Sequence, residues 1–218
     1  MVILGLPPAT AIATAKFGGF GMSLGSSSRF FREKMTDTRT IIIFSVIGGF
    51  GALIGSLLLV KFSSHSDQLQ TIMGYAILIV GIPTLYLRNA GLVAKPRPIW
   101  LKAIGLALLG IGVMVQVALG SGIGSLQLIV LISCFGMTAL VASATRRFMQ
   151  LTVATISLIV FMLTGLVDYQ YGVVVFLTAL IGGYIGTHIA IKKGNKFVIN
   201  LFAATSALLA LELILGSQ

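Results

Sequence analysis

The sequence predicts an all-α fold: a polytopic transmembrane helix bundle built from two sequence repeats. Of the 218 residues, 57% are hydrophobic and only 9% are charged, whereas a soluble domain carries about a quarter charged residues. The mean hydropathy of +1.06 leaves no polar part large enough for a separate soluble domain. Several apolar runs reach the ~20 residues that a bilayer-crossing helix needs. Such runs must be helical, because the bilayer core holds no water to satisfy backbone hydrogen bonds.

The net charge of +10 does not point to nucleic acid. The basic residues stand in short connections between the apolar runs, as the positive-inside rule describes, rather than on one soluble face. We therefore expect the lipid bilayer as the surroundings and no nucleic-acid partner. In chain order, the clearest spans are Thr40–Phe62, Leu69–Leu87, Ile99–Leu119, Tyr171–Ile191 and Phe197–Leu215.

The second half of the chain repeats the first at a shift of 131 residues. Gly5–Phe17 aligns with Gly136–Phe148, with identical Gly, Ala, Ala, Thr and Phe residues, and Lys16 falls opposite Arg147. Two separate matches at one shift are much less frequent by chance than one. The second match pairs Gly51–Ser56 with Gly182–Thr187.

This repeat divides one integral membrane domain into a first repeat, residues 1–98, and a second repeat, residues 99–218. The second repeat opens with Ile99–Phe135, a run of 37 residues before the aligned Gly136. Only four residues precede Gly5, so we expect the first repeat to lack its opening membrane segment. Both a fragment of a longer protein and a naturally shortened protein would lack this opening segment.

Loop charge predicts how the segments cross the membrane. If Ile99–Phe135 crosses the membrane twice, breaking at Gly120–Ser125, eleven basic residues lie on one side of the membrane and one lies on the other. If it crosses once, eight basic residues lie on one side and four on the other. The double crossing is favoured, and it makes the repeats inverted, as in many secondary transporters. The alternative is a re-entrant half-helix, because Ile123–Phe135 would be only ~20 Å long. The basic loops are 29–39, 88–98 and 192–196, against 61–68 and 165–170.

Basic residues inside the aligned apolar segments are the sharpest functional signal. Lys16, Arg146 and Arg147 lie there, and a cation near the bilayer centre is costly and usually functional. With Thr14 and Thr145 nearby, Lys16 and Arg147 are candidates to bind a small oxyanion across a pseudo-two-fold axis. The alternative is snorkelling, in which the long side chains carry their charges to the interface.

The glycine-rich break at Gly120–Ser125 is a second candidate binding feature. A helix that restarts after it would direct free N–H groups and a positive dipole end at an anion, as discontinuous transporter helices do. A tight extracellular turn explains the break equally well. The candidate substrate-binding residues here are Ser121, Gly122, Gly124 and Ser125.

Other conspicuous residues favour structural roles. Gly51–Gly55 and Gly182–Gly186 read G-x-x-x-G, which lets helices pack closely and permits a homodimer without requiring one. His188 and Cys134 are expected to be structural. The sequence contains no metal-ligand cluster, nucleophile triad or Walker loop, so we expect neither an enzyme nor a metal or other cofactor.

Several motifs resemble one known family. Gly5-Leu-Pro-Pro-Ala-Thr-Ala-Ile-Ala-Thr-Ala-Lys16, followed by Ser26–Arg32 and a basic loop, resembles the first-repeat signature of the TauE/SafE sulfite exporter family. Ile82–Tyr86 and the second copy, from Gly120 through Arg147 to Gly186, are similar as well. Thr14-Ala15-Lys16 departs from the family's Thr-Asn-Lys-like tripeptide at its middle residue, and the first-repeat glycine-rich stretch is absent.

The resemblance implies a multi-pass permease of the bacterial cell (inner) membrane. It implies transport of a small sulfur-containing or organic anion, of the sulfite, thiosulfate or sulfonate class. The alternative function is a non-transporting membrane protein, either an assembly partner or a truncated remnant whose buried basic residues are structural.

Overall fold

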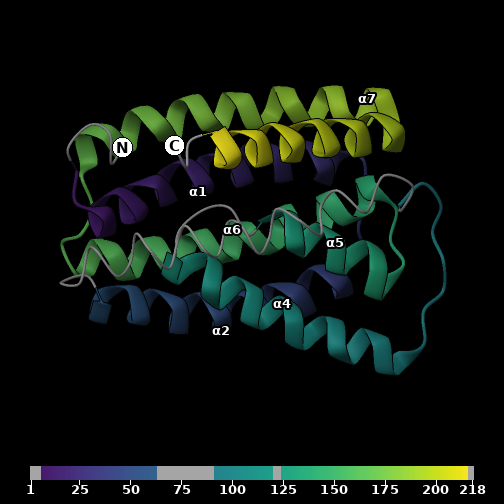
Figure 1. The fold of residues 1–218 in the computed structure, drawn as a ribbon, viewed down its shortest axis with the longest axis horizontal. Helices are drawn as coiled ribbons and strands as arrows, with labels where there is room; N and C mark the ends of the chain where they lie inside the picture. The colour runs from purple at the N-terminus through teal and green to yellow at the C-terminus, as the bar shows by residue number, and fades with distance from the viewer. Residues whose placement is uncertain (1–5, 63–90, 120–123, 216–218) are drawn as a thin grey trace.

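The computed structural model describes residues 6–62, 91–119 and 124–215. All regular structure in these ranges is α-helical, which confirms the predicted fold class (Figure 1). The expected span Leu69–Leu87 and the candidate residues Ser121 and Gly122 lie outside the described residues. The helices are α1 (Pro8–Arg32), α2 (Thr38–Phe62), α4 (Ile99–Leu119), α5 (Gly124–Phe135), α6 (Ala139–Leu163) and α7 (Tyr169–Leu215).

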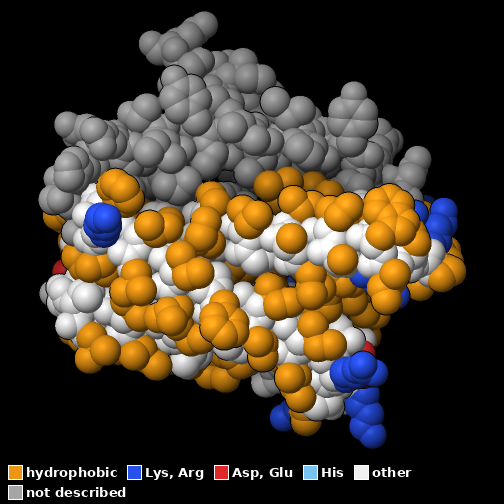
Figure 2. Space-filling model, turned by 90° about the horizontal axis from the view of Figure 1, so that it is seen from below, with side chains coloured by type: hydrophobic (Ala, Val, Ile, Leu, Met, Phe, Trp, Pro, Cys, Tyr) orange, Lys and Arg blue, Asp and Glu red, His pale blue; other side chains and the backbone are white. Residues whose placement is uncertain are grey.

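Four described helices are long and apolar enough to cross a membrane. They confirm the prediction of several membrane-spanning helices. The described part of the face seen in Figure 2 carries hydrophobic side chains along its length. α1 is not among them, although its 25 residues would extend about 38 Å at 1.5 Å per residue. α1 packs against α6 and α7. The four spans are Thr38–Phe62, Ile99–Ala118, Ala139–Leu163 and Tyr169–Leu201.

Two predicted connections are shorter than expected. The loop predicted at 29–39 is wrong at both ends, because α1 continues to Arg32 and α2 begins at Thr38. A carboxylate oxygen of Asp37 accepts a hydrogen bond from the Thr40 backbone N–H at 3.0 Å and so caps α2. The turn predicted at 192–196 is reduced to a break at Gly194, whose φ of 81° interrupts the helical run of α7.

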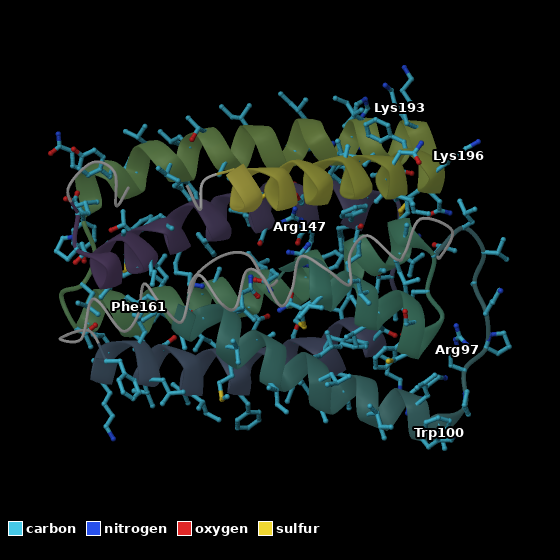
Figure 3. All side chains as sticks on the ribbon, viewed as in Figure 1. Arg97, Trp100, Arg147, Phe161, Lys193 and Lys196 are labelled. Atoms are coloured by element: carbon cyan, nitrogen blue, oxygen red, sulfur yellow. The ribbon has the colours of Figure 1, made fainter. Side chains whose placement is uncertain are left out.

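Several connections meet at one end of the bundle, which we call the basic end. The backbone N–H of Lys95 donates to the Gly136 carbonyl at 2.9 Å, and that of Leu140 donates to Asn195 Oδ1 at 2.8 Å. Figure 3 shows Arg97, Trp100, Lys193 and Lys196 at this end. Connections 33–37 and 91–98 and the Gly194 break therefore share one side, as loop charge predicts.

The opposite, far end of the bundle holds the beginning of α1 and the connection between α6 and α7. The backbone N–H of Asp168 donates to Thr14 Oγ1 at 3.0 Å across this end. Among the described residues at or beside the connections of the far end, Lys61 in the last turn of α2 is the only basic one. Under the positive-inside rule, the charge difference between the ends predicts that the basic end is cytoplasmic.

α4 and α5 form a hairpin that starts and finishes at the basic end. Gly105, near the start of α4, lies against Cys134 and Phe135 at the end of α5. α5 has only 12 residues, which extend about 18 Å, so it covers roughly half of a ~30 Å hydrocarbon core. The chain returns to its starting side, and the length of α5 matches the half-helix alternative.

Helix bounds correspond at the shift found in the sequence. Adding 131 to the first and last residues of α1 gives those of α6, and adding it to the start of α2 gives the start of α7. α1 and α6 run in opposite directions, since α1 begins at the far end and α6 at the basic end. Such a correspondence is what an inverted repeat would produce.

Local geometry follows the same correspondence. Asp168 Oδ1 accepts from the Tyr171 backbone N–H at 3.2 Å and caps α7, as Asp37 caps α2. Lys34 has a φ of 49°, and the equivalent Gly165 has a φ of 69°. The left-handed region disfavours residues with a Cβ, so both connections turn in the same unusual way.

Candidate functional site

The two candidate threonines lie at opposite ends of the bundle. Both side chains are fully buried. Thr14 accepts the hydrogen bond from Asp168, whereas Thr145 Oγ1 lies 3.4 Å from Thr36 Oγ1. Each threonine thus binds the connection that follows the equivalent helix of the other repeat. The structure does not bring them together, and their hydroxyl groups hold the two repeats to each other.

The three candidate cations lie well inside the bundle. Lys16 is in α1, and Arg146 and Arg147 are in the first half of α6. Figure 3 shows Arg147 near the middle of the bundle, between its two ends. All three side chains are half-buried. Within the described ranges neither Lys16 nor Arg147 forms a hydrogen bond or an ion pair.

Arg146 belongs to a polar cluster that sequence reasoning missed. Three glutamines meet where three helices converge: Gln116 of α4, Gln127 of α5 and Gln150 of α6. Gln127 Nε2 donates to Gln116 Oε1 at 2.7 Å, and Gln150 Nε2 donates to the same oxygen at 2.9 Å and to Gln127 Oε1 at 2.8 Å. Arg146 Nε donates to Gln127 Oε1 at 3.3 Å.

This cluster has more hydrogen-bond donors than acceptors. A glutamine side chain has two N–H donors and an arginine has five. The Gln116 amide nitrogen and the terminal guanidinium nitrogens of Arg146 donate to no other described residue. Gln127 and Gln150 are buried, with exposed fractions of 1% and 9%. A ligand that accepts several hydrogen bonds and carries negative charge would satisfy this cluster.

No carboxylate with a described side chain neutralises the buried cations. Glu33 pairs with Arg29 at 2.6 Å near the basic end. Asp37 and Asp168 cap helices at opposite ends of the bundle. Among the described residues, the positive charge at mid-depth therefore has no carboxylate beside it.

The glycine-rich break leads into α5 at mid-depth. Gly124 and Ser125 are the first two residues of α5, and Gln127, in the same first turn, contacts Gln150 near the middle of α6. The free N–H groups of this turn point away from the basic end, because the helix runs toward that end. The structure thus places the N-terminus of the half-helix α5 beside Arg146.

The remaining conspicuous residues take structural positions. Gly51 and Gly55 lie against the backbone of α4. Arg29 Nε donates to His188 Nδ1 at 3.2 Å and links α1 to α7. Cys134 is buried, with 8% of its surface exposed. Among the described residues no group of histidine, cysteine or acidic side chains could hold a metal ion.

Comparison with known proteins matches the chain to one family over almost its whole length. The sulfite exporter TauE/SafE family matches residues 1–213. A probable membrane transporter protein of Haemophilus influenzae is 22% identical over 214 residues, which cover 98% of this chain and 83% of that protein. The probable membrane transporter protein YfcA of Escherichia coli K12 is 23% identical, covering 100% of this chain and 80% of that protein. No solved structure matches the chain.

The fold and the position of the three cations define a multi-pass helical membrane protein with basic side chains inside its helix bundle. The family match over residues 1–213 then identifies the family to which this membrane protein belongs. The chain belongs to the sulfite exporter TauE/SafE family and is a membrane transporter of that family.

Proposed function

We propose that this protein is a secondary transporter that moves a small sulfur-containing or organic anion, of the sulfite, thiosulfate or sulfonate class, across the cell (inner) membrane. The observation that carries the proposal is the group of basic side chains at mid-depth with no described carboxylate beside them. Unpaired charge in a membrane interior is costly and marks ion pathways. The family's description as sulfite exporters supports the choice of anion.

The described residues suit an oxyanion in particular. The planar guanidinium group presents several donors in a fixed fork that matches two oxygens of one anion. Arg146 retains its terminal N–H groups for this purpose, and the N-terminus of α5 adds a positive dipole end. Lys16 and Arg147, at equivalent positions of the two repeats, add charge along the path. We assign Thr14 and Thr145 to packing, because their hydroxyl groups already have partners.

The test is anion flux in proteoliposomes containing the chain, with sulfite, thiosulfate, sulfate, a sulfonate and acetate as substrates. We expect saturable flux of one sulfur anion. Arg146→Ala and Arg147→Ala should each remove charged hydrogen bonds of about 1.5–3 kcal/mol, which weakens binding roughly 10- to 150-fold. Lys16→Ala should reduce flux in the same way. The matched control is Lys102→Ala, near the basic end, which should leave transport unchanged.

Normal flux in all three alanine variants would contradict the proposed site. An absence of flux for every anion, in protein shown to be folded, would contradict transport by this chain. It would favour the alternative of a non-transporting membrane partner.

A further inference from the structure

Gln127 lies at the centre of the polar cluster that joins α4, α5 and α6. It stands in the first turn of α5, and 1% of its surface is exposed. Its Nε2 donates to Gln116 Oε1 at 2.7 Å. Its Oε1 accepts from Gln150 Nε2 at 2.8 Å and from Arg146 Nε at 3.3 Å. An amide oxygen has two lone pairs, so these two donors occupy the Gln127 oxygen fully.

The neighbours of Gln127 determine the orientation of its amide group. A guanidinium group donates hydrogen bonds and cannot accept them, so the atom of Gln127 beside Arg146 Nε must be the oxygen. The nitrogen of the same amide then faces Gln116 Oε1, which can only accept. Partners on α4 and α6 therefore hold this side chain of α5 from both sides. Figure 1 shows α5 packed beside these two helices.

The hydrogen bond to Gln127 leaves one end of Arg146 open for binding. A guanidinium group is planar and carries one N–H on Nε and four on its two terminal nitrogens. Gln127 occupies the Nε N–H, and the terminal nitrogens donate to no other described residue. An anion therefore meets Arg146 at the tip of the side chain, through both terminal nitrogens. Two oxygens of one oxyanion match that fork, whereas a single-atom anion such as chloride does not.

The neutral charge of Gln127 matters as much as its position. A glutamate at position 127 could accept the same two hydrogen bonds, but it would also form an ion pair with Arg146 and neutralise it. The amide instead fixes the guanidinium group and leaves its positive charge without a described carboxylate beside it. A residue that only had to anchor Arg146 would do so more strongly as a carboxylate. Gln127 therefore suits a guanidinium group that has to bind an anion.

We propose that Gln127 is a positioning residue for the transported anion. It holds Arg146 Nε so that the terminal nitrogens present their fork to the anion, and it thereby selects anions with two or more oxygens over chloride. This inference rests on the proposed function, because it states how that site chooses its substrate. The alternative is a purely structural role, in which the glutamines only tie α4 and α5 to α6.

The experiment measures the flux of labelled sulfite, thiosulfate and methanesulfonate into proteoliposomes, with chloride as a competitor, for the parent chain, Gln127→Glu and Gln127→Leu. We expect both variants to raise the KM of the transported oxyanion by at least about tenfold, the effect of losing one charged hydrogen bond. In Gln127→Leu the selectivity for that oxyanion over chloride should fall by a similar factor, because the freed guanidinium group no longer presents a fixed fork.

Two features of the variants keep the test independent of folding. Gln127→Glu retains the shape and the hydrogen bonds of the amide, so it tests the charge even if Gln127→Leu does not fold. Gln170→Glu makes the same change of charge at an exposed position near the start of α7. This matched control should leave the KM and the selectivity unchanged.

A second comparison shows whether Gln127 acts through Arg146. In an Arg146→Ala background, Gln127→Leu should cause no further rise in KM, because the side chain that Gln127 positions is gone. An equal rise in both backgrounds would overturn the positioning role. Variants that yield less folded protein but keep the KM and the selectivity of the parent would overturn it as well, since a structural role predicts that result.

Failure of this inference is distinguishable from failure of the proposed function. If the parent chain transports a sulfur anion and the Gln127 variants keep its KM and selectivity, the positioning role is wrong and the proposed function stands. If the folded parent chain transports none of the three anions, the proposed function is wrong and the positioning role falls with it.

Discussion

Gly55 and Gly186 occupy equivalent positions in the two repeats but should respond oppositely to the same substitution. A Cβ at Gly55 would lie against the backbone of Met114 and 2.9 Å from Val117 Cβ, whereas one at Gly186 would meet no atom of the described residues within 4 Å. Overpacking of this kind destabilises a protein by about 1–3 kcal/mol. Replacing glycine with alanine within a helix gains up to about 1 kcal/mol at either position. That gain cancels in the comparison, so Gly55→Ala should be less stable than Gly186→Ala by about 1–3 kcal/mol.

The assay is reversible unfolding of the purified chain in mixed micelles, with helix content followed as the denaturing detergent increases. Gly186→Ala should match or exceed the parent protein in stability, and Gly55→Ala should fall below Gly186→Ala. Gly112→Ala is a second control, because a Cβ at Gly112 of α4 would also meet no atom within 4 Å in the described part of the chain. Equal stability of the Gly55 and Gly186 variants would refute the close packing of α2 on α4.

Three further predictions follow from local geometry. Lys34→Gly should raise the thermal unfolding temperature, because it relieves a left-handed conformation that costs a residue with a Cβ about 1–2 kcal/mol; Gly165→Ala should lower it. Hydrogen bonding from Thr40 holds the pKa of Asp37 below its ordinary value of 3.8. The resulting stability is present above that ordinary value and is lost as the pH falls through the lower folded pKa, so Asp37→Asn should flatten the acid limb of a pH–stability curve. Gln150→Leu removes two buried hydrogen bonds and should destabilise the chain by about 1–2 kcal/mol in the unfolding assay. Gln170→Leu, at an exposed position near the start of α7, should leave the stability unchanged.

The membrane spans were predictable from the sequence because long apolar runs leave little choice of structure. The expected Ile99–Leu119 coincides with α4, and the expected start of Thr40–Phe62 is two residues from that of α2. α1 was harder to delimit, since its second half is rich in glycine and serine and has weak hydropathy. Those glycines serve packing instead: Gly21 and Gly25 bring α1 against the backbone of α7.

The candidate site was predictable only where a residue is out of place in its segment. Lys16, Arg146 and Arg147 stand out because cations are rare in apolar runs. The glutamines do not, because neutral amides on three separate helices share no spacing that a sequence pattern could reveal. The equivalent threonines Thr14 and Thr145 looked like ligands, but only the folded chain shows that each hydroxyl group is bound to a connection of the other repeat.

The two repeats differ most at the centre of the proposed site. The half-helix α5 directs its free N–H groups toward the far end, beside Arg146. The positions of α1 that are equivalent to Arg146 and Gln150 are Ala15 and Gly19, which have no hydrogen-bonding side chain, and both are exposed. Among the described residues, the amide and guanidinium donors of the proposed site therefore gather on the α6 side of the bundle. We expect the site to be asymmetric although the helices around it repeat, because the polar side chains that would bind the anion belong to one repeat only.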